Sequence, residues 1–459
     1  MKDAHGLELS TDSAASVAAW DHLIDGFLRY RADLPQRLAA LLAAAPELGL
    51  AHSIQGYIMM LGYKAALLPA ARAAAATARR LPATEREQRH AEALAAWIDD
   101  DLDRAIALWE AILRQHPHDV LAVRLSHFVN FWLGRPQDML ASIERVIPSY
   151  GAGVPGYATV LACRCFANEE CGNYAAAEPD GRRAIEIDPA NMWAAHAVAH
   201  VMEMQGRRQE GIAWVTGLAP NWEGGSNLQH HLWWHCALFH LENGDHDTVL
   251  ELYDQRFRNL ASPLTVAAPD AYIDVQNAAS MLFRLARLGV AVGRRWDELA
   301  DLAEGKIGDT QSAFTLPHWM MALSAAGRTE AAQKMLDGMR ATSNRSGTTA
   351  GIVVAYALPV SDAVRLHGEG RFGEAVDRML PVIGGMYRLG GSYAQQDVLE
   401  QLFLDAANRA GRQDAVRLVT ERVAARRPIP LARHVGWQEA ARLVGGGPHA
   451  GVSPIAASL

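Results

Sequence analysis

The sequence predicts an all-α fold, a solenoid or superhelix of antiparallel helix pairs. The main observation is a glycine followed by Arg, Asn or Asp, which recurs at intervals of 34 to 49 residues. A run with helical apolar spacing precedes and follows each glycine, and no stretch alternates like a strand. Glycine ends a helix in a left-handed conformation at no steric cost, so each copy indicates a tight helix–helix turn. The copies begin at Gly134, Gly172, Gly206, Gly244, Gly293, Gly327, Gly370 and Gly411.

One copy carries small residues and a proline at the spacing of the tetratricopeptide repeat. With its glycine at repeat position 15, positions 15, 17, 20, 27 and 32 hold Gly172, Tyr174, Ala177, Ala184 and Pro189. An upstream copy keeps Ala105 and Pro117 at positions 20 and 32, with Asp100 in place of the glycine. The small residues let paired helices approach, and the proline stops the second helix. The other copies are looser, so the chain resembles a degenerate array of tetratricopeptide-like helix pairs.

The first hundred residues also have helical features. Thr84 and Glu87 form the pattern of a capping box ahead of a helix that carries Trp97. Pro35 favours the start of another helix, which Pro46 ends. We therefore expect a single solenoid over residues 1–444, with its clearest repeats in 100–260. The Gly-rich stretch 445–459 predicts a flexible C-terminal tail.

Composition excludes several classes of protein. Half of the 459 residues are hydrophobic and a fifth are charged, so the chain can bury a large core. Its formal net charge of -8 disfavours nucleic acid or an anionic membrane as a partner. We see no secretory signal and no apolar run of about 18 residues that could span a membrane, so we expect a cytoplasmic protein. The cysteines, which we expect to be reduced and buried, are Cys163, Cys165, Cys171 and Cys236.

The histidines are unevenly distributed along the chain. There are 18, and six fall between positions 196 and 240. Repeat positions 2, 5, 6, 9 and 12 line the concave face of a tetratricopeptide array. Counted from the nearest turn glycine, these positions hold His196, His200, Glu203, His231, His235 and His318, which we expect to face one shared groove. His127 falls on position 8, which predicts packing between helices.

Two histidines four residues apart lie one above the other on a helix and can chelate one metal ion. This stretch offers the pair twice, at 196/200 and 231/235, and Glu203 adds a carboxylate one turn from His200. Three histidines and a carboxylate would suit Zn, Fe or Mn. Two other interpretations stay open: a metal-free polar pocket, and histidines that only hydrogen-bond within the fold. The HExxH motif of zinc proteases is absent.

Other conspicuous residues have ordinary structural explanations. Trp193, Trp233 and Trp234 are more typical of packing between helices than of a ligand cage. Gly390-Gly391-Ser392 lacks the Gly-Lys-Ser/Thr of a phosphate loop and no strand precedes it, so we expect it to be a turn that starts a helix.

Four longer motifs make the chain similar to the tetratricopeptide repeat protein 38 family. They are HAVAHVMEM from His196, HLWWH from His231, GGSYAQQD from Gly390 and, more weakly, SMLFR from Ser280, with Leu9-Ser10-Thr11 near the start. The resemblance covers roughly residues 5 to 440 and implies a single superhelical solenoid, but no settled activity. Two residues depart from the family pattern: Gln396 replaces an Arg, and Leu232 replaces a polar residue.

The same resemblance directs attention to Asp397, which opens a helix near the end of the array. An array of this length makes close to a full superhelical turn. Asp397 could then face the histidines across the central hole, as could Asp270 or Asp274. The alternative is that a carboxylate there only meets the helix dipole.

These observations favour a binding module that holds a small molecule or a short peptide in a His- and acid-lined concave pocket. The alternative is an enzyme in the same pocket, either metal-dependent or using His/carboxylate acid–base chemistry. A scaffold that docks other proteins on its outer surface is a third interpretation.

Overall fold

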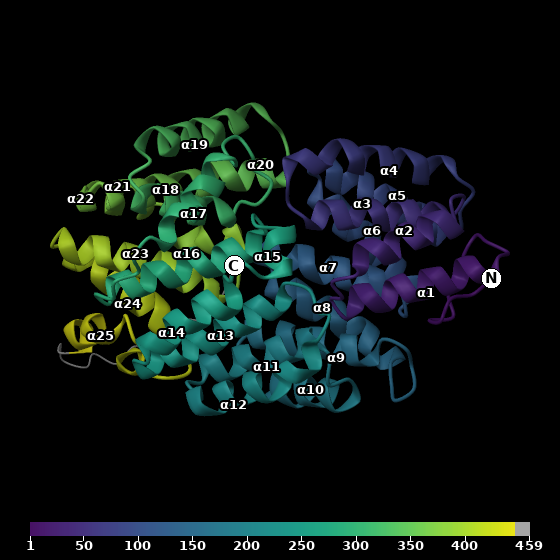
Figure 1. The fold of residues 1–459 in the computed structure, drawn as a ribbon, viewed down its shortest axis with the longest axis horizontal. Helices are drawn as coiled ribbons and strands as arrows, with labels where there is room; N and C mark the ends of the chain where they lie inside the picture. The colour runs from purple at the N-terminus through teal and green to yellow at the C-terminus, as the bar shows by residue number, and fades with distance from the viewer. Residues whose placement is uncertain (446–459) are drawn as a thin grey trace.

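The computed structural model describes residues 1–445, and helices make up most of them (Figure 1). The only extended pairings in this range are two isolated bridges, Lys2 with Glu8 and Arg31 with Gly225. The all-α fold class is therefore confirmed. Residues 446–459, which hold nearly all of the expected tail, lie outside the described residues, and Gly445 is the last residue of a helix.

Helices before residue 120 pack as antiparallel neighbours. The capping box is present. The Thr84 side chain accepts a hydrogen bond from the backbone amide of Glu87, and the Glu87 carboxylate accepts one from the backbone amide of Thr84. Pro35 lies in the first turn of its helix, as expected. The helices are α1 (Ala14–Leu28), α2 (Leu34–Ala44), α3 (Gly49–Leu61), α4 (Leu68–Arg80), α5 (Glu85–Ile98) and α6 (Leu102–Gln115).

The central part holds the regular helix pairs. Each glycine of the motif separates the two helices of a pair, and all eight adopt positive φ, between 59° and 82°. Asp100, which takes the glycine's place between α5 and α6, has φ 62°. The central helices are α7 (Val120–Trp132), α8 (Pro136–Val146), α9 (Tyr157–Glu170), α10 (Tyr174–Ile187), α11 (Met192–Met204), α12 (Arg208–Leu218), α13 (Leu228–Asn243) and α14 (His246–Leu252).

The C-terminal part is less regular. Two π-helical segments, η4 (Tyr253–Phe257) and η6 (Val353–Ala357), extend or join α-helices. The helices are α15 (Pro263–Ala267), α16 (Tyr272–Arg287), α17 (Arg295–Glu304), α18 (Thr315–Ala325), α19 (Thr329–Ala341), α20 (Thr348–Ile352), α21 (Leu358–Gly368), α22 (Phe372–Met379), α23 (Tyr393–Arg409), α24 (Gln413–Ala424) and α25 (Gln438–Gly445). As expected, Ser392 caps α23 after the Gly390–Gly391 turn.

The first helices of successive pairs stack on one another, and the array then closes on itself. Contacts run from α9 to α11, α13, α16, α18, α21 and α23, and α23 also touches α11 and α16. A second long-range contact joins α20 to the N-terminal helices (Figure 1). There the Asp100 carboxylate accepts from the amides of Thr349 and Ala350 at 2.9 and 3.0 Å. The groove at the centre of the superhelix is therefore enclosed.

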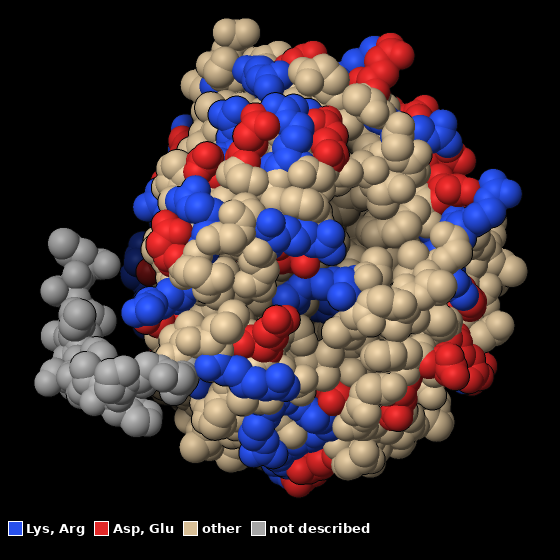
Figure 2. All heavy atoms as spheres, turned by 90° about the vertical axis from the view of Figure 1, so that its left-hand side faces the viewer, with Lys and Arg blue, Asp and Glu red and all other residues tan. Residues whose placement is uncertain are grey.

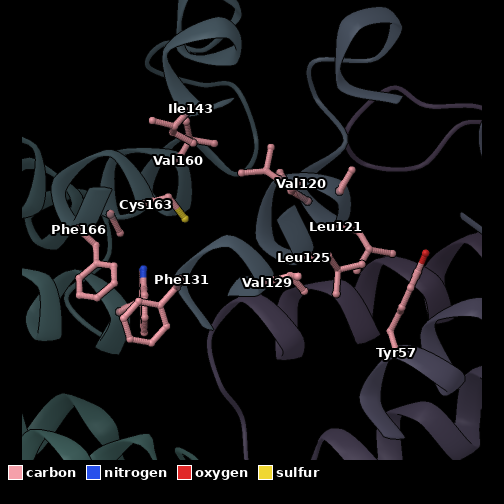
Figure 3. Packing of buried hydrophobic residues seen from close by; sticks show 14 of the residues in the cluster. Tyr57, Val120, Leu121, Leu125, Val129, Phe131, Ile143, Val160, Cys163 and Phe166 are labelled. Carbon is pink, nitrogen blue, oxygen red and sulfur yellow. The ribbon is translucent and has the colours of Figure 1, made fainter. Parts of the chain in front are cut away.

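The core follows the repeat pattern. Ala105, Ala177 and Ala184 are fully buried where paired helices cross. Figure 3 shows how α7 is covered on two sides: its Leu125 lies toward Tyr57, and Val160 and Phe166 of α9 lie beyond its other flank. A first helix in this array is thus packed between neighbours, which leaves little of it in solvent.

Surface charge is mixed rather than segregated. Figure 2 shows basic and acidic side chains interspersed over the face that carries the C-terminal helices. Exposed pairs there include Arg412 with Asp377 at 2.8 Å. The cysteines are free thiols, three of them buried, as expected.

One helical stretch, Thr348–Gly368, is long and apolar enough to cross a membrane, with a mean hydropathy of 1.3 in its best window. It meets this test by length and composition only, and Ser361, Asp362 and Arg365 interrupt its apolar residues. Half of that window is buried inside the protein, since α21 packs against α18 and α22.

Ala184→Arg tests the repeat phase. Its arginine would be forced between α10 and its neighbours, and overpacking and charge burial should lower the free energy of unfolding by about 3 kcal/mol or more. Chemical denaturation of the variant measures this loss. Ala176→Arg, on the exposed face of the same helix, is the matched control and should change little. Equal stability of both variants would contradict the phase.

Candidate metal centre at four histidines

Four imidazoles from two neighbouring first helices converge at one point. α11 supplies His196 and His200, and α13 supplies His231 and His235. The ring centroids of His200 and His235 lie 4.4 Å apart, and those of His196 and His231 lie 4.9 Å apart. One nitrogen of each ring lies within 4.8 Å of one nitrogen of every other. The repeat phase therefore brought the two i, i+4 pairs face to face.

The cluster is sealed rather than open. None of the four histidines is more than 3% exposed, whereas the sequence analysis expected them to line a groove. Phe166 and Trp193 cover one side, and Trp234 stacks on His231 with an interplanar angle of 12°. The difference arises because α16 and α23 close over the concave face, which local periodicity cannot reveal.

Outer hydrogen bonds orient two of the rings. The Nδ1–H of His235 donates to Glu203 Oε2 at 2.9 Å, and the Nδ1–H of His231 donates to Asn277 Oδ1 at 2.7 Å. A neutral imidazole has one N–H, so the Nε2 atoms of both rings carry lone pairs. Metal-binding histidines commonly donate their second ring nitrogen in this way.

The inner nitrogens are poorly satisfied by the protein. His196 Nε2 and His200 Nε2 lie 2.9 Å apart and share one hydrogen bond. His196 Nδ1 and His235 Nε2 are buried without a partner. Burial lowers the pKa of these histidines, and that of His235 falls to about 3. For His196 and His200, the neighbouring imidazole rings lower the pKa further. All four are therefore neutral at pH 7, the state that can bind a metal ion.

Acidic and basic side chains border the cluster on the Glu203 side. Burial raises the pKa of Glu203 to about 7, although Arg427 and Arg284 oppose this effect. Asp397 forms ion pairs with the same two arginines, 3.1 and 3.3 Å away. These cations outweigh burial and lower its pKa to about 2. A small cavity of about 30 Å³ lies among these four residues.

Other candidates from the sequence lie elsewhere. His318 donates from Nδ1 to the Phe314 carbonyl at 2.9 Å and is not one of the clustered histidines. Asp270 pairs with Lys64 and Lys306, and Asp274 with His230. As expected, His127 packs between Phe166 and Trp193. Gln396 donates to the Gly390 and Gly391 carbonyls, which stabilises the turn before α23.

Sequence reasoning missed a pair of acids at the end of α9. Glu169 Oε2 lies 3.7 Å from His200 Nδ1, and Glu170 follows it in the chain. Counted from Gly172, Glu169 takes repeat position 12, the same position that Glu203 takes in the next repeat. The repeat phase therefore already marked Glu169 as a residue of the concave face. Burial raises the pKa of both acids, and that of Glu170 rises to about 8.

Comparison with known proteins finds low sequence identity and low TM-scores. No protein-family model matches the chain. A solved structure of a monomeric mutant of IFIT1 with Gppp-AAAA aligns over 95% of each chain, at 13% identity and a TM-score of 0.37. The structure of Naa15/Naa10 bound to HypK-THB aligns over 93% of this chain and 65% of that one, at 10% identity and a TM-score of 0.25.

The architecture itself defines the class. Antiparallel helix pairs, left-handed turns between their helices and stacked first helices are the features of a tetratricopeptide-type helical-repeat protein. What this chain binds has to be argued from its own interior.

His318→Asn tests whether His318 is structural. Burial, and secondarily Arg284, lowers its pKa from 6.5 to about 4. Protonation therefore favours the unfolded chain, and its contribution to stability is lost as pH falls from 6.5 toward 4. Asn can keep the hydrogen bond without titrating, so the wild type should lose about 2 kcal/mol more than the variant between pH 7 and pH 5. Denaturant unfolding at both values measures this. Parallel pH profiles would contradict the assignment.

Proposed function

We propose that this chain is a helical-repeat metalloprotein that holds one first-row transition-metal ion at His196, His200, His231 and His235. One observation carries the proposal: four neutral, buried imidazoles converge, and two of their ring nitrogens have no partner. A buried polar atom without a partner costs about 1–3 kcal/mol. A metal ion would bind one nitrogen of each ring and could thereby supply a partner to His235 Nε2.

Hydrogen bonding within the cluster is a weaker explanation. His231 and His235 direct their N–H groups outward to Asn277 and Glu203, so both present lone pairs inward. Only one hydrogen bond joins rings of the cluster, that between His196 and His200. Lone pairs that face one another need a cation between them, and a metal ion supplies it.

The donor set narrows the choice of ion. Imidazole suits Zn, Cu, Fe and Ni, whereas Mn prefers oxygen ligands. Glu203 accepts a hydrogen bond from His235 and is not one of the nitrogen donors that face the centre. Four histidines therefore describe the ligand set better than three histidines and a carboxylate. Zn and Fe remain from the ions expected from the sequence.

A metal ion fits the burial better than the larger ligands do. A short peptide has no access to rings that are at most 3% exposed. A small molecule could reach the centre only from the side of Glu203, where the cavity of about 30 Å³ has room for about one water. That cavity is the observation that favours the second candidate, a metal-dependent enzyme whose reactant approaches from this side.

Membership of the tetratricopeptide repeat protein 38 family is part of the proposal. Apart from Leu9-Ser10-Thr11, the motifs that carry the resemblance lie on α11, α13, α16 and the start of α23. These four helices contact one another around the histidines. The resemblance is therefore concentrated at the candidate site, as expected if the family shares what is bound there.

Metal analysis of the protein, purified without added metal, tests the proposal. We expect near-stoichiometric Zn or Fe in the wild type. His200→Ala and His235→Ala should each weaken binding more than ~100-fold, because loss of a ligand should exceed the 10–100-fold effect of an outer partner. Glu203→Gln, which changes such a partner, should fall within that range.

His240→Ala is the matched control, since His240 lies on α13 but pairs with Asp245 outside the cluster. It should bind metal like the wild type. Far-UV circular dichroism must show that all variants are folded. Protein that stays metal-free after incubation with Zn²⁺ or Fe²⁺, or full binding by both alanine variants, would refute the proposal.

A further inference from the structure

A second cluster of metal-binding side chains lies directly beside the first. Glu169 and Glu170 end α9, and one ligand atom of each lies within 4.8 Å of the other and of a His200 nitrogen. His200 belongs to both clusters. Its Nε2 lies 2.9 Å from His196 Nε2, and its Nδ1 lies 3.7 Å from Glu169 Oε2. The two nitrogens of one ring therefore face two different sets of donors.

Glu169 is an unpaired carboxylate in the interior. It is 0% exposed, and neither of its oxygens has a hydrogen-bond donor. Glu170 is 7% exposed, and its Oε1 also lacks a donor. Among the described residues, no Lys or Arg nitrogen comes within 4.0 Å of either carboxylate, and the 3.7 Å approach of His200 is too long for a hydrogen bond.

Other buried acids in this interior have arginine partners. Asp397 has Arg284 and Arg427, and Glu400 has Arg422 and Arg426. The fold thus supplies guanidinium groups to buried carboxylates as a rule. Two adjacent buried carboxyl groups without a cation cannot both ionise, because their charges would repel each other and removing an ion from water costs several kcal/mol. A bound cation at this place would allow both acids to ionise and would supply the partner that the other buried acids have.

We propose that Glu169, Glu170 and Nδ1 of His200 bind a second divalent ion, and that His200 bridges it to the first as an imidazolate. This inference rests on the proposed function, because the bridge needs an ion at the four histidines. The carboxylates suit a harder ion than the imidazoles do, so Mn²⁺, Fe²⁺ and Zn²⁺ are the class expected here.

Charge balance supports two ions rather than one. When both nitrogens of His200 bind metal, the ring N–H is lost, and the carboxyl protons of Glu169 and Glu170 are lost as these acids bind; all three protons are released to solvent. Two divalent ions bring four positive charges. The imidazolate, the two carboxylates and Glu203 bring four negative charges. The pair of sites is then neutral, which the low-dielectric interior favours.

The test counts metal ions. The wild type, loaded with Mn²⁺, Fe²⁺ or Zn²⁺ and then desalted, should hold two ions per chain by elemental analysis. The double variant Glu169→Gln, Glu170→Gln should hold one, since amides of the same shape replace the acids and leave the four histidines intact. Glu92→Gln, which changes an exposed acid on α5, should hold two.

Copper provides a readout of the bridge. Two Cu²⁺ ions joined by an imidazolate couple magnetically, so the wild type should show fewer electron spins than copper ions, whereas the double variant should show one spin per ion. One ion per chain in both proteins would overturn this inference and leave the four-histidine site standing. No ion in either would overturn the proposed function and this inference with it. Two ions in both proteins would exclude the acids as ligands.

Discussion

Closure of the superhelix is the constraint on which the rest of the structure depends. α23 reaches back to α11 and α16, and Asp397 holds that contact through Arg284 and Arg427. A carboxylate taken out of water is costly, and these two cations with donors from Trp437 and Gln401 offset the cost. Without this contact, the inward faces of α11 and α13 would meet solvent, and water would satisfy their imidazoles.

Burial is what makes the histidines informative. An exposed imidazole needs no explanation, but a buried one must find partners or destabilise the fold. Some buried groups meet this requirement, as Arg86 and His90 do at Asp119, whereas neither ring nitrogen of His127 has a partner. Unpaired polar atoms occur elsewhere in the core too, but around His200 they belong to side chains that can bind a metal ion and that lie together. It is this gathering of imidazole nitrogens and carboxyl oxygens that supports the proposal of a bound cation.

Much of this could be predicted from the sequence, because the helix-pair array is a local, periodic structure. The turn glycines set the phase, and the phase alone placed His196 opposite His231. It also placed Glu169 in line with Glu203, although that equivalence was not used. The sealed state of the cluster could not be predicted, because it depends on contacts such as Arg284 to Asp397, 113 residues apart. His318 shares the repeat phase, but its ring donates to the Phe314 carbonyl. Repeat phase alone therefore wrongly placed it in the site.

The regular and the irregular parts of the array have different structural roles. The turn glycines from Gly172 to Gly244 are spaced by 34 and 38 residues, and here adjacent first helices must stay aligned for two i, i+4 pairs to meet. The next interval is 49 residues, and it contains the π segment η4 and the short helix α15. α16, which follows these insertions, contacts α13, α18 and α23. The irregular repeats therefore have a structural role. The regular part fixes the positions of the four histidines, and helices of the irregular part enclose them.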